Sequence, residues 1–351
     1  MSTPITLPSL ALALALGAPQ SAPHVRVERR LGAMGTGLEL VVEDSSRELA
    51  LAASERAARA IESVERRLST WSEGSELARL NRTPVGTALE LSEELARELN
   101  AAREVWVLTA GAFDPSVGGW VRAWGLRSGG RLPAAEEIEA ARVPGGFGAL
   151  LLDGRSATRT ALNLELEEGG FGKGAGLDAG VAALEDGSAR GWIDLGGQVS
   201  TFGEFPEALA FGVADPSNRE REVLRVRIRS GSLATSGNSE RGVIVDGERL
   251  GHLIDPRTGR PAPDFGSLTV HAQSALCADA LATGLFVLGP DAALEFARRE
   301  PGVSVLVLET TGDDELRLRV AGDWLAEPEI LDPRVRFRVQ PSHSTPAKTI
   351  R

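Results

Sequence analysis

The sequence is poor in cysteine and histidine, and each shortage removes a class of site. A single cysteine, Cys277, excludes an intrachain disulfide and any zinc or iron–sulfur centre built from several cysteines. Of the four histidines, His24 and His343 lie near the chain ends, which leaves too few for a histidine-rich metal site. The formal net charge of −11 argues against a nucleic-acid-binding protein, because such proteins carry a basic patch.

Lysine and tyrosine are also scarce. Tyrosine is absent, and lysine occurs only at Lys173 and Lys348, so the other 36 of the 38 basic residues are arginines. Lys173 lies within a cluster of glycines, where a compact ammonium either has a specific role or arose by chance. The 40 glycines predict many turns and places where the backbone is approached closely. With 42% hydrophobic and 25% charged residues, the remaining composition is that of a globular protein.

The first residues resemble an export signal. The apolar run 7–18 is too short to span a membrane, and small residues follow it. Residues 1–6 carry no lysine or arginine, which departs from the usual pattern. We therefore predict a signal peptide over 1–22 and a periplasmic protein, with a cytoplasmic location as the alternative. Residues 23–340 are expected to form the folded domain, and the Pro/Ser/Thr-rich residues 341–351 a disordered tail.

Hydrophobic periodicity predicts helices early in the chain and strands later. The predicted helices cover 45–68, 92–108, a short acidic segment that opens at Pro133, 175–184 and 274–288. The predicted strands cover 37–43, 149–153, 161–167, 191–195, 209–214, 222–228, 242–245, 249–254, 267–272, 303–308 and 316–320, and 111–124 is predicted to be irregular. This order favours an α+β fold with largely antiparallel sheets flanked by helices over a continuous βαβ series.

The segment 169–174, GGFGKG, is the first candidate site. Glycines at the start of a helix let backbone amides reach a phosphate. The Walker A pattern fails because Gly174 stands where Ser or Thr is required. A dinucleotide fingerprint fits Gly170, Gly172 and Ala175, with Asp194 ending the next strand, although the preceding segment is too charged for a buried parallel strand. A turn without a ligand remains the third interpretation.

Asp279 and Thr283 form the second candidate. Their i, i+4 spacing places both on one face of a helix that is otherwise apolar. A carboxylate and a hydroxyl are oxygen ligands of the kind that Mg²⁺ takes in proteins. A polar pair that only bridges the helix to a loop is the alternative.

Three further segments carry polar or aromatic groups. In 251–262, GHLIDPRTGRPA, His252 is suited to moving a proton near neutral pH, or it is held by a turn carbonyl. Ser236, in the segment LATSGNSER, is a candidate donor to a phosphate or ribose, although such turns are common without a function. The segment 111–125, GAFDPSVGGWVRAWG, holds aromatics that either stack on a planar ring or fill the core.

Taken together and in order, these segments resemble the ApbE family of FAD:protein FMN transferases. The resemblance rests on MGT, LSTW, SEL…LN, GAFDPSVGGWVRAWG, GFGKGAGLD, DLGG, ATSGNSER, HLIDPRTGRP and ADALATGLFVLG. It implies an ApbE-like, T-fold-like α+β domain. It also implies transfer of FMN from FAD to a Ser/Thr hydroxyl of an acceptor flavoprotein subunit of an electron-transfer complex, with release of AMP.

The resemblance also implies roles for particular residues. It implies a Mg²⁺ site made by the carbonyl of Gly172 and the side chains of Asp279 and Thr283, and a role for His252 in deprotonating the acceptor hydroxyl. Lys173 is expected near the diphosphate or as an orienting group. The implied FAD contacts are Met34, Trp71, Ala112, Phe113, Asp114, Gly169, Ala175 and Ile254.

The chain departs from the family pattern before the double glycine. The usual apolar-Asp-Leu is replaced by Leu166-Glu167-Glu168, which adds negative charge beside a phosphate site, and Ala175 cannot stack as an aromatic would. Three other functions stay open: an FAD pyrophosphatase that passes FMN to water, a non-catalytic FAD-binding homologue, and a Rossmann-like protein that uses Asp194.

Overall fold

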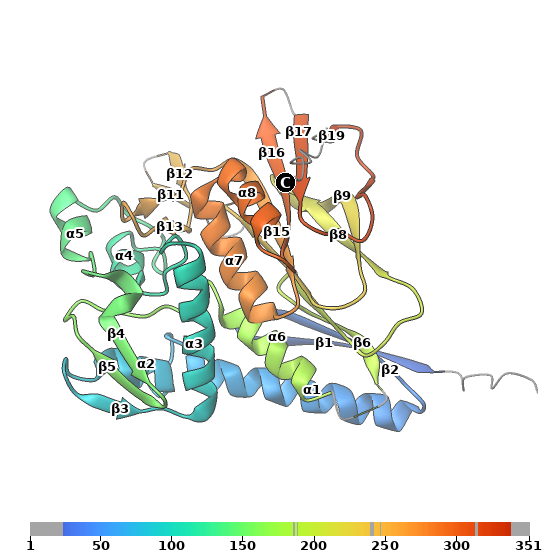
Figure 1. The fold of residues 1–351 in the computed structure, drawn as a ribbon, viewed down its shortest axis with the longest axis horizontal. Coiled ribbons are helices and arrows are strands. Elements are labelled where there is room, and N and C mark those ends of the chain that lie inside the picture. Colours follow the sequence, from blue (N-terminus) through green and yellow to red (C-terminus); the bar gives the residue numbers. More distant parts are fainter. Residues whose placement is uncertain are drawn as a thin grey trace, which may run out of the picture.

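A computed structural model describes residues 24–184, 187, 189–238, 242–245, 247–312 and 315–337. Its largest element is a nine-stranded sheet (Figure 1). Along the sheet the strands run β1 (Val25–Ala33), β2 (Thr36–Asp44), β6 (Arg190–Leu195), β7 (Gln198–Phe202), β10 (Ser232–Gly237), β15 (Gly266–Ala272), β16 (Ser304–Thr311), β17 (Glu315–Ala321) and β19 (Val335–Phe337). The sheet and its helices confirm the α+β prediction.

The pairing within this sheet is almost entirely antiparallel. Only β17 and β19 run parallel among the described strands. In particular, β6 is antiparallel to both β2 and β7. A dinucleotide-binding fold requires parallel strands joined by crossover helices, so the Rossmann-like interpretation is wrong.

Four helices position the segments that matter for function. They are α1 (Arg47–Leu68), α3 (Glu93–Leu108), α6 (Gly172–Ala182) and α7 (Ala275–Leu288). Helix α6 lies between α1 and α7, while α7 packs on β10 and β15 and is flanked on its other side by α3 (Figure 1). Close packing of α6 on α7 requires Gly174, because a Cβ there would lie 2.2 Å from the Ala275 carbonyl oxygen.

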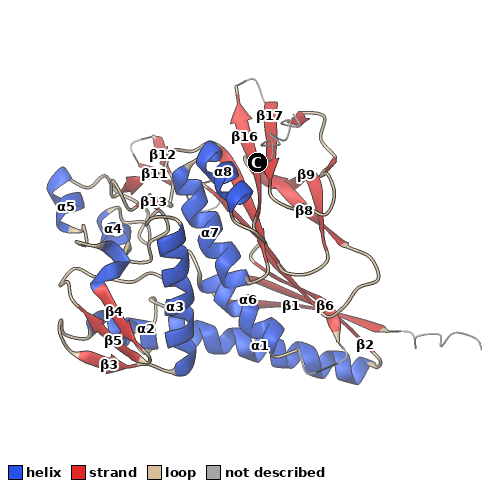
Figure 2. Ribbon diagram, in the orientation of Figure 1, coloured by secondary structure: helices blue, strands red, loops and turns tan. Residues whose placement is uncertain are grey.

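Smaller elements surround this frame. Figure 2 shows β8 and β9 standing away from α1, α3 and α6. The remaining helices are α2 (Glu76–Arg82), α4 (Gly118–Ala123), α5 (Ala135–Ala140), α8 (Pro290–Arg299) and a 3₁₀ turn at Gly146–Ala149. The remaining strands form β3 (Ala88–Glu90)–β5 (Ser156–Arg159)–β4 (Leu150–Asp153), β18 (Glu329–Ile330)–β9 (Asn218–Ile228)–β8 (Leu209–Asp215), β11 (Val243–Val245)–β12 (Glu248–Leu250) and β13 (Ile254–Asp255)–β14 (Arg260–Pro261).

Most predicted elements are confirmed, and four are corrected. The predicted strand 161–167 is irregular, because Leu166 pairs with the side chain of Asn81 through its amide and its carbonyl. Helix α6 begins at Gly172 rather than at 175, since its glycines form its first turn. The segment 111–124 contains α4 and so is not wholly irregular, and the predicted strand 249–254 is divided between β12 and β13.

The chain ends lie outside the described residues. The predicted signal peptide 1–22 and tail 341–351 therefore stay predictions, as does the single domain over 23–340. Within the part of the chain that the structure describes, no helix is both long and apolar enough to cross a membrane.

Candidate active site at the α6–α7 junction

The glycine segment and the acidic helix meet although they are about a hundred residues apart. Asp279 on α7 is 5% exposed, and its Oδ2 accepts a hydrogen bond from the amide of Gly174 at 3.0 Å. Its Oδ1 lies 3.2 Å from Nζ of Lys173, which is 28% exposed. One carboxylate is thus held against the first turn of α6 by an amide and an ammonium.

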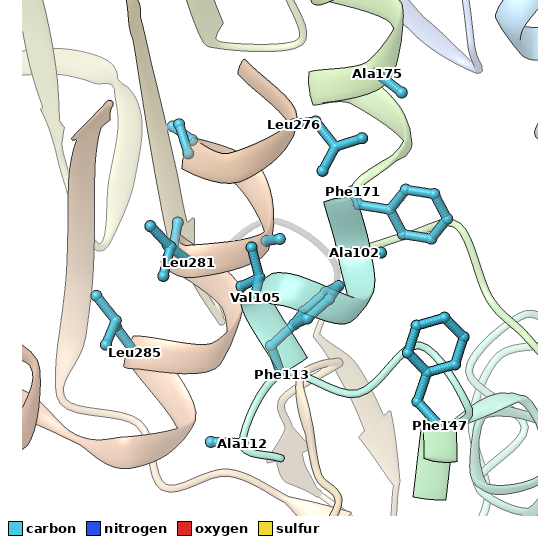
Figure 3. Packing of buried hydrophobic residues seen from close by; sticks show 14 of the residues in the cluster. Ala102, Val105, Ala112, Phe113, Phe147, Phe171, Ala175, Leu276, Leu281 and Leu285 are labelled. Atoms are coloured by element: carbon cyan, nitrogen blue, oxygen red, sulfur yellow. The ribbon is translucent and has the colours of Figure 1, made fainter. Parts of the chain in front are cut away.

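Thr283 lies one turn further along α7 and faces the same segment. A Cβ on Gly170 would come within 3.2 Å of the Thr283 hydroxyl oxygen and of the Phe113 ring. The absence of that Cβ keeps space beside the hydroxyl. Figure 3 shows Phe113 in the buried cluster with Phe171 and residues of α7. Phe113 and Thr283 therefore border the glycine segment from two different elements.

Asp178, which the sequence analysis missed, fixes this junction. Its carboxylate, on α6, accepts hydrogen bonds from the amides of Ala275 at 2.6 Å and Leu276 at 3.0 Å, and from the hydroxyl of Ser274 at 2.7 Å. Amides at a helix start lack partners within the helix, and a negative charge there is favourable. Asp178 thereby sets the position of α7, and with it Asp279, relative to α6.

The start of α6 offers less to a phosphate than its glycines suggest. The amide of Gly172 donates to the carbonyl of Glu168 at 2.7 Å, and the amide of Gly174 is taken by Asp279. A phosphate cradled by the helix start needs such amides to be available. Two of them are already used within the protein, so a cation held by Asp279 is better supported than an anion held by this helix alone.

Met34 forms the turn between β1 and β2 beside α6. Its φ of 51° is in the left-handed region, which is unusual for a residue with a side chain. Cβ atoms on Gly172 and Gly176 would lie 3.5 Å from its Cε and 2.9 Å from its Sδ. The strained turn therefore places the thioether against the glycine face of α6. Strain of this kind is concentrated at functional sites.

Trp71 is presented on the surface by a cluster of four residues, Thr70, Arg127, Glu167 and Glu168. The indole is 68% exposed, and the Arg127 guanidinium carbon lies 4.4 Å from its ring centroid. Arg127 also bonds to Glu167 and to the hydroxyl of Thr70. That hydroxyl donates to Glu168 at 2.5 Å.

The acidic pair that departs from the family pattern is accounted for within this cluster. Burial raises the pKa of Glu167 to about 7, against the opposing effect of Arg127. The Glu168 carboxylate accepts from the amide of Thr70 at 3.3 Å and lies 3.9 Å from Arg127. The extra negative charge is directed toward Thr70 and Arg127, which act as its partners.

Asp114 and Ala112, the chain neighbours of Phe113, are both buried. Asp114 is 8% exposed and accepts from the amide and hydroxyl of Ser116, from the indole of Trp106 at 3.1 Å and from the amide of Phe147 at 3.0 Å. Burial raises its pKa despite these bonds. Its side chain holds together the loop that carries Phe113, so a contact between Asp114 and FAD stays a prediction.

His252 and Ile254 belong to a loop held by two tryptophans. The indoles of Trp120 and Trp124 are 3% and 4% exposed, and Trp124 donates to the carbonyl of Gly259 at 2.8 Å. These aromatics therefore fill the core rather than stack on a ligand. Ile254 belongs to the same buried cluster as these two rings. Half-buried His252 follows Gly251, where a Cβ would lie 2.3 Å from Oδ1 of Asn238.

Arg257 connects the loop that carries His252 to the C-terminal half of α7. It pairs with buried Asp255 at 2.8 Å and donates to the carbonyl of Val287 at 3.2 Å. The loop therefore contacts the C-terminal part of the helix whose N-terminal part carries Asp279. The remaining predicted residues are Gly169, exposed before α6, Ala175, buried in α6, and Ser236, 9% exposed in β10.

A metal site here would not be built from acidic side chains alone. No group of three or more histidine, cysteine or acidic residues that could hold an ion is found in the part of the chain that the structure describes. The oxygen atoms at the junction are a carboxylate, a hydroxyl and backbone carbonyls. Cys277, on the same helix, has its pKa raised by burial and is not activated.

Comparison with known proteins finds one family. A model of the ApbE family matches residues 34–307. The FAD:protein FMN transferase of Escherichia coli (strain K12) is 33% identical over 258 residues, which cover 70% of this chain and 73% of that protein. The enzyme of the same name from Haemophilus influenzae is 30% identical over 264 residues, or 71% of this chain and 76% of that protein.

Solved structures agree with this result. The ApbE protein from Thermotoga maritima superposes with a TM-score of 0.74 at 30% identity and covers 81% of this chain and 94% of its own. The flavin transferase ApbE from Vibrio cholerae superposes with a TM-score of 0.73 at 26% identity and covers 85% and 98%.

Proposed function

The chain belongs to the ApbE family, and on that premise we propose that it transfers FMN from FAD to a Ser/Thr hydroxyl of an acceptor protein, with Mg²⁺ as cofactor and AMP as the other product. One observation carries the proposal. Asp279 meets the glycine segment at Gly174 and Lys173, with Thr283 on the same side of α7. This arrangement supports cleavage of a diphosphate held at the junction.

The donor set at the junction suits Mg²⁺. The Asp279 carboxylate, the Thr283 hydroxyl and the Gly172 carbonyl are hard oxygen ligands, and Mg²⁺ commonly binds few protein groups while it keeps waters and substrate phosphate. Gly170, without a Cβ, leaves space beside the Thr283 hydroxyl. When bound there, the ion would neutralise the charge that develops on the diphosphate oxygens as the bond breaks.

The chain's own residues supply the remaining chemistry. His252 accepts the proton of the acceptor hydroxyl, because a hydroxyl is a weak nucleophile until a base assists it. The hydroxyl oxygen then bonds to the phosphorus of the FMN half, and the bond from that phosphorus to the bridging oxygen breaks, so that AMP leaves with the oxygen. Lys173 provides a positive charge beside the diphosphate while it stays within 3.2 Å of Asp279.

The flavin and adenine rings of FAD need apolar surfaces near this junction. Trp71 offers an exposed indole, and half-buried Met34 borders the glycine segment, which the buried ring of Phe113 contacts from the interior. Exposed aromatic faces stack well on planar rings. We include Trp71, Met34, Ala112, Phe113, Asp114, Gly169, Ala175, Ser236 and Ile254 in the proposed FAD site.

We also propose that the protein is exported to the periplasm and acts there on a flavoprotein subunit of an electron-transfer complex. The apolar run 7–18 supports export. Fractionating cells that express the full chain or a form lacking residues 2–22 tests this. Recovery of both forms in the cytoplasm at full length would contradict export.

Incubation with FAD and Mg²⁺ tests the activity. The protein substrate of the Escherichia coli relative serves as acceptor and that enzyme as positive control. We expect AMP release that depends on the acceptor, and an acceptor mass increased by FMN. AMP and free FMN without acceptor would identify an FAD pyrophosphatase, and FAD binding without AMP a non-catalytic homologue.

Variants of Asp279 test the assigned site. Asp279→Asn keeps an oxygen that can accept from the Gly174 amide but removes the charge, so we expect a folded protein whose Mg²⁺-dependent AMP release falls by at least about 100-fold. Arg131→Gln, which changes an exposed ion pair with Glu137, is the matched control. Full Mg²⁺-dependent cleavage by Asp279→Asn would refute the assigned site.

A further inference from the structure

We propose that Arg127 is a positioning residue that holds the indole of Trp71 from one side, so that its other face can stack on a planar ring of FAD. This inference rests on the proposed function and deepens it. Neither the sequence pattern nor the family resemblance singled out Arg127. The residue lies in the loop that follows α4, far along the chain from Trp71.

The first support is the geometry of the pair. The guanidinium carbon lies 4.4 Å from the ring centroid of Trp71, a distance typical of a planar cation on an aromatic face. The indole is nevertheless 68% exposed, while Arg127 itself is 29% exposed. A large aromatic with one face supported and the rest in solvent is suited to receive a second planar group.

The second support is the anchoring of Arg127. Its guanidinium bonds to the carboxylate of Glu167 and to the hydroxyl of Thr70, and it donates to the Thr70 carbonyl at 3.4 Å. A guanidinium that is planar and has several fixed donors can hold these partners and stack at the same time, which an ammonium cannot do. Arg127 is therefore fixed in place before any ligand arrives.

The third support is the link to the α6–α7 junction. Thr70, which precedes Trp71, bonds through its amide and hydroxyl to Glu168, and the carbonyl of Glu168 accepts from the amide of Gly172. The indole is thus connected by short contacts to the first turn of α6. A ring stacked on Trp71 and a diphosphate at the glycine segment are compatible with one FAD molecule.

Equilibrium binding at pH 8, measured by titration calorimetry without Mg²⁺, tests the role of Arg127. We expect Arg127→Gln to weaken FAD binding about 10-fold and Arg127→Lys to weaken it nearly as much, since lysine keeps the charge but lacks the planar face. Arg131 is an exposed arginine in the same loop between α4 and α5, and the variant Arg131→Gln should bind FAD as the parent protein does. Parent-like binding by Arg127→Lys would overturn the stacking role, because charge alone would then suffice.

A double-mutant cycle separates positioning from direct contact. If Arg127 acts through Trp71, then Trp71→Ala and the double variant Trp71→Ala/Arg127→Gln bind FAD equally weakly. A further 10-fold loss in the double variant would show that Arg127 touches the ligand itself, and would overturn the inference. Melting temperatures of all variants establish that each is folded.

Two half-ligands identify the ring. FMN carries the flavin and ADP the adenine, so the one whose binding is weakened by Arg127→Gln contains the ring on Trp71. Loss in neither would overturn the inference. These outcomes differ from failure of the proposed function, which would appear as a parent protein that binds FAD but forms neither AMP nor an FMN adduct.

Discussion

Asp178 provides the sharpest test of how this fold builds its site. Its carboxylate accepts from two amides and one hydroxyl at the start of α7. The change Asp178→Ala leaves those amides without their partner and removes a favourable charge from a helix start. Hydrogen bonds to a charged group contribute about 1.5–3 kcal/mol each but are not additive, and the dipole effect adds up to about 1 kcal/mol. We expect the free energy of unfolding to fall by about 2–4 kcal/mol.

Urea unfolding, followed by tryptophan fluorescence and circular dichroism, measures this change. Asp178→Asn is the matched variant, because its amide oxygen can accept one of the bonds, and its loss should be smaller. Ser274→Ala removes the hydroxyl that donates to Asp178 and accepts from the amide of Cys277 at the start of α7. It should lower the free energy of unfolding by about 1 kcal/mol. A loss below about 0.5 kcal/mol for Asp178→Ala would refute the claim that this carboxylate joins the two helices.

Three further predictions follow from buried groups. Asp114→Ala leaves four donors without their acceptor, so we expect the free energy of unfolding to fall by about 3 kcal/mol. Urea denaturation measures this loss, and an unchanged midpoint would contradict it. Gly174→Ala would place a Cβ 2.2 Å from the Ala275 carbonyl oxygen, so we expect the free energy of unfolding to fall by about 2–3 kcal/mol. Parent-like stability in the same assay would show that α6 and α7 can move apart without cost. Folding raises the pKa of Glu167 from 4.5 to about 7, so between these values the folded protein holds a proton that the unfolded chain releases. The free energy of unfolding should therefore fall by up to about 3 kcal/mol as the pH rises from 4.5 to 8. Glu167→Gln should flatten this pH dependence, and an equal slope in both proteins would contradict the assignment.

The sequence predicted those parts of the structure that depend on local patterns. Helix α3 begins after Ser92, the first residue of the predicted segment 92–108, and the Ser92 hydroxyl accepts from the amide of Leu95. Helix α7 matches its predicted span after Ser274. The prediction of a strand over 161–167 was wrong. The alternating apolar residues Leu164 and Leu166 are buried, as in a strand, but the segment does not pair with a neighbouring strand. Periodicity reports burial of side chains, and it does not report where the backbone hydrogen bonds go.

The site residues also divide into those marked by local spacing and those whose partners are distant in the chain. Asp279 and Thr283 could be paired from the sequence because their i, i+4 spacing is local. Asp178 and Arg127 could not, since the first bonds to residues about a hundred positions away and the second to Thr70 and Glu167 across two loops. Such residues are identified only when the fold brings their partners together, and no spacing in the chain marks them.

The junction of α6 and α7 is held by an exchange of carboxylates. Asp178 on α6 accepts from the first amides of α7, and Asp279 on α7 accepts from the Gly174 amide in the first turn of α6. Each helix start, which attracts negative charge, is thus capped by an acid from the other helix. Because Asp279 belongs to this exchange and also faces Lys173, the group proposed to hold the cation is fixed by the packing of the helices themselves. Packing and site are therefore one arrangement, and a change at Asp178 or Gly174 should reduce both stability and FAD cleavage.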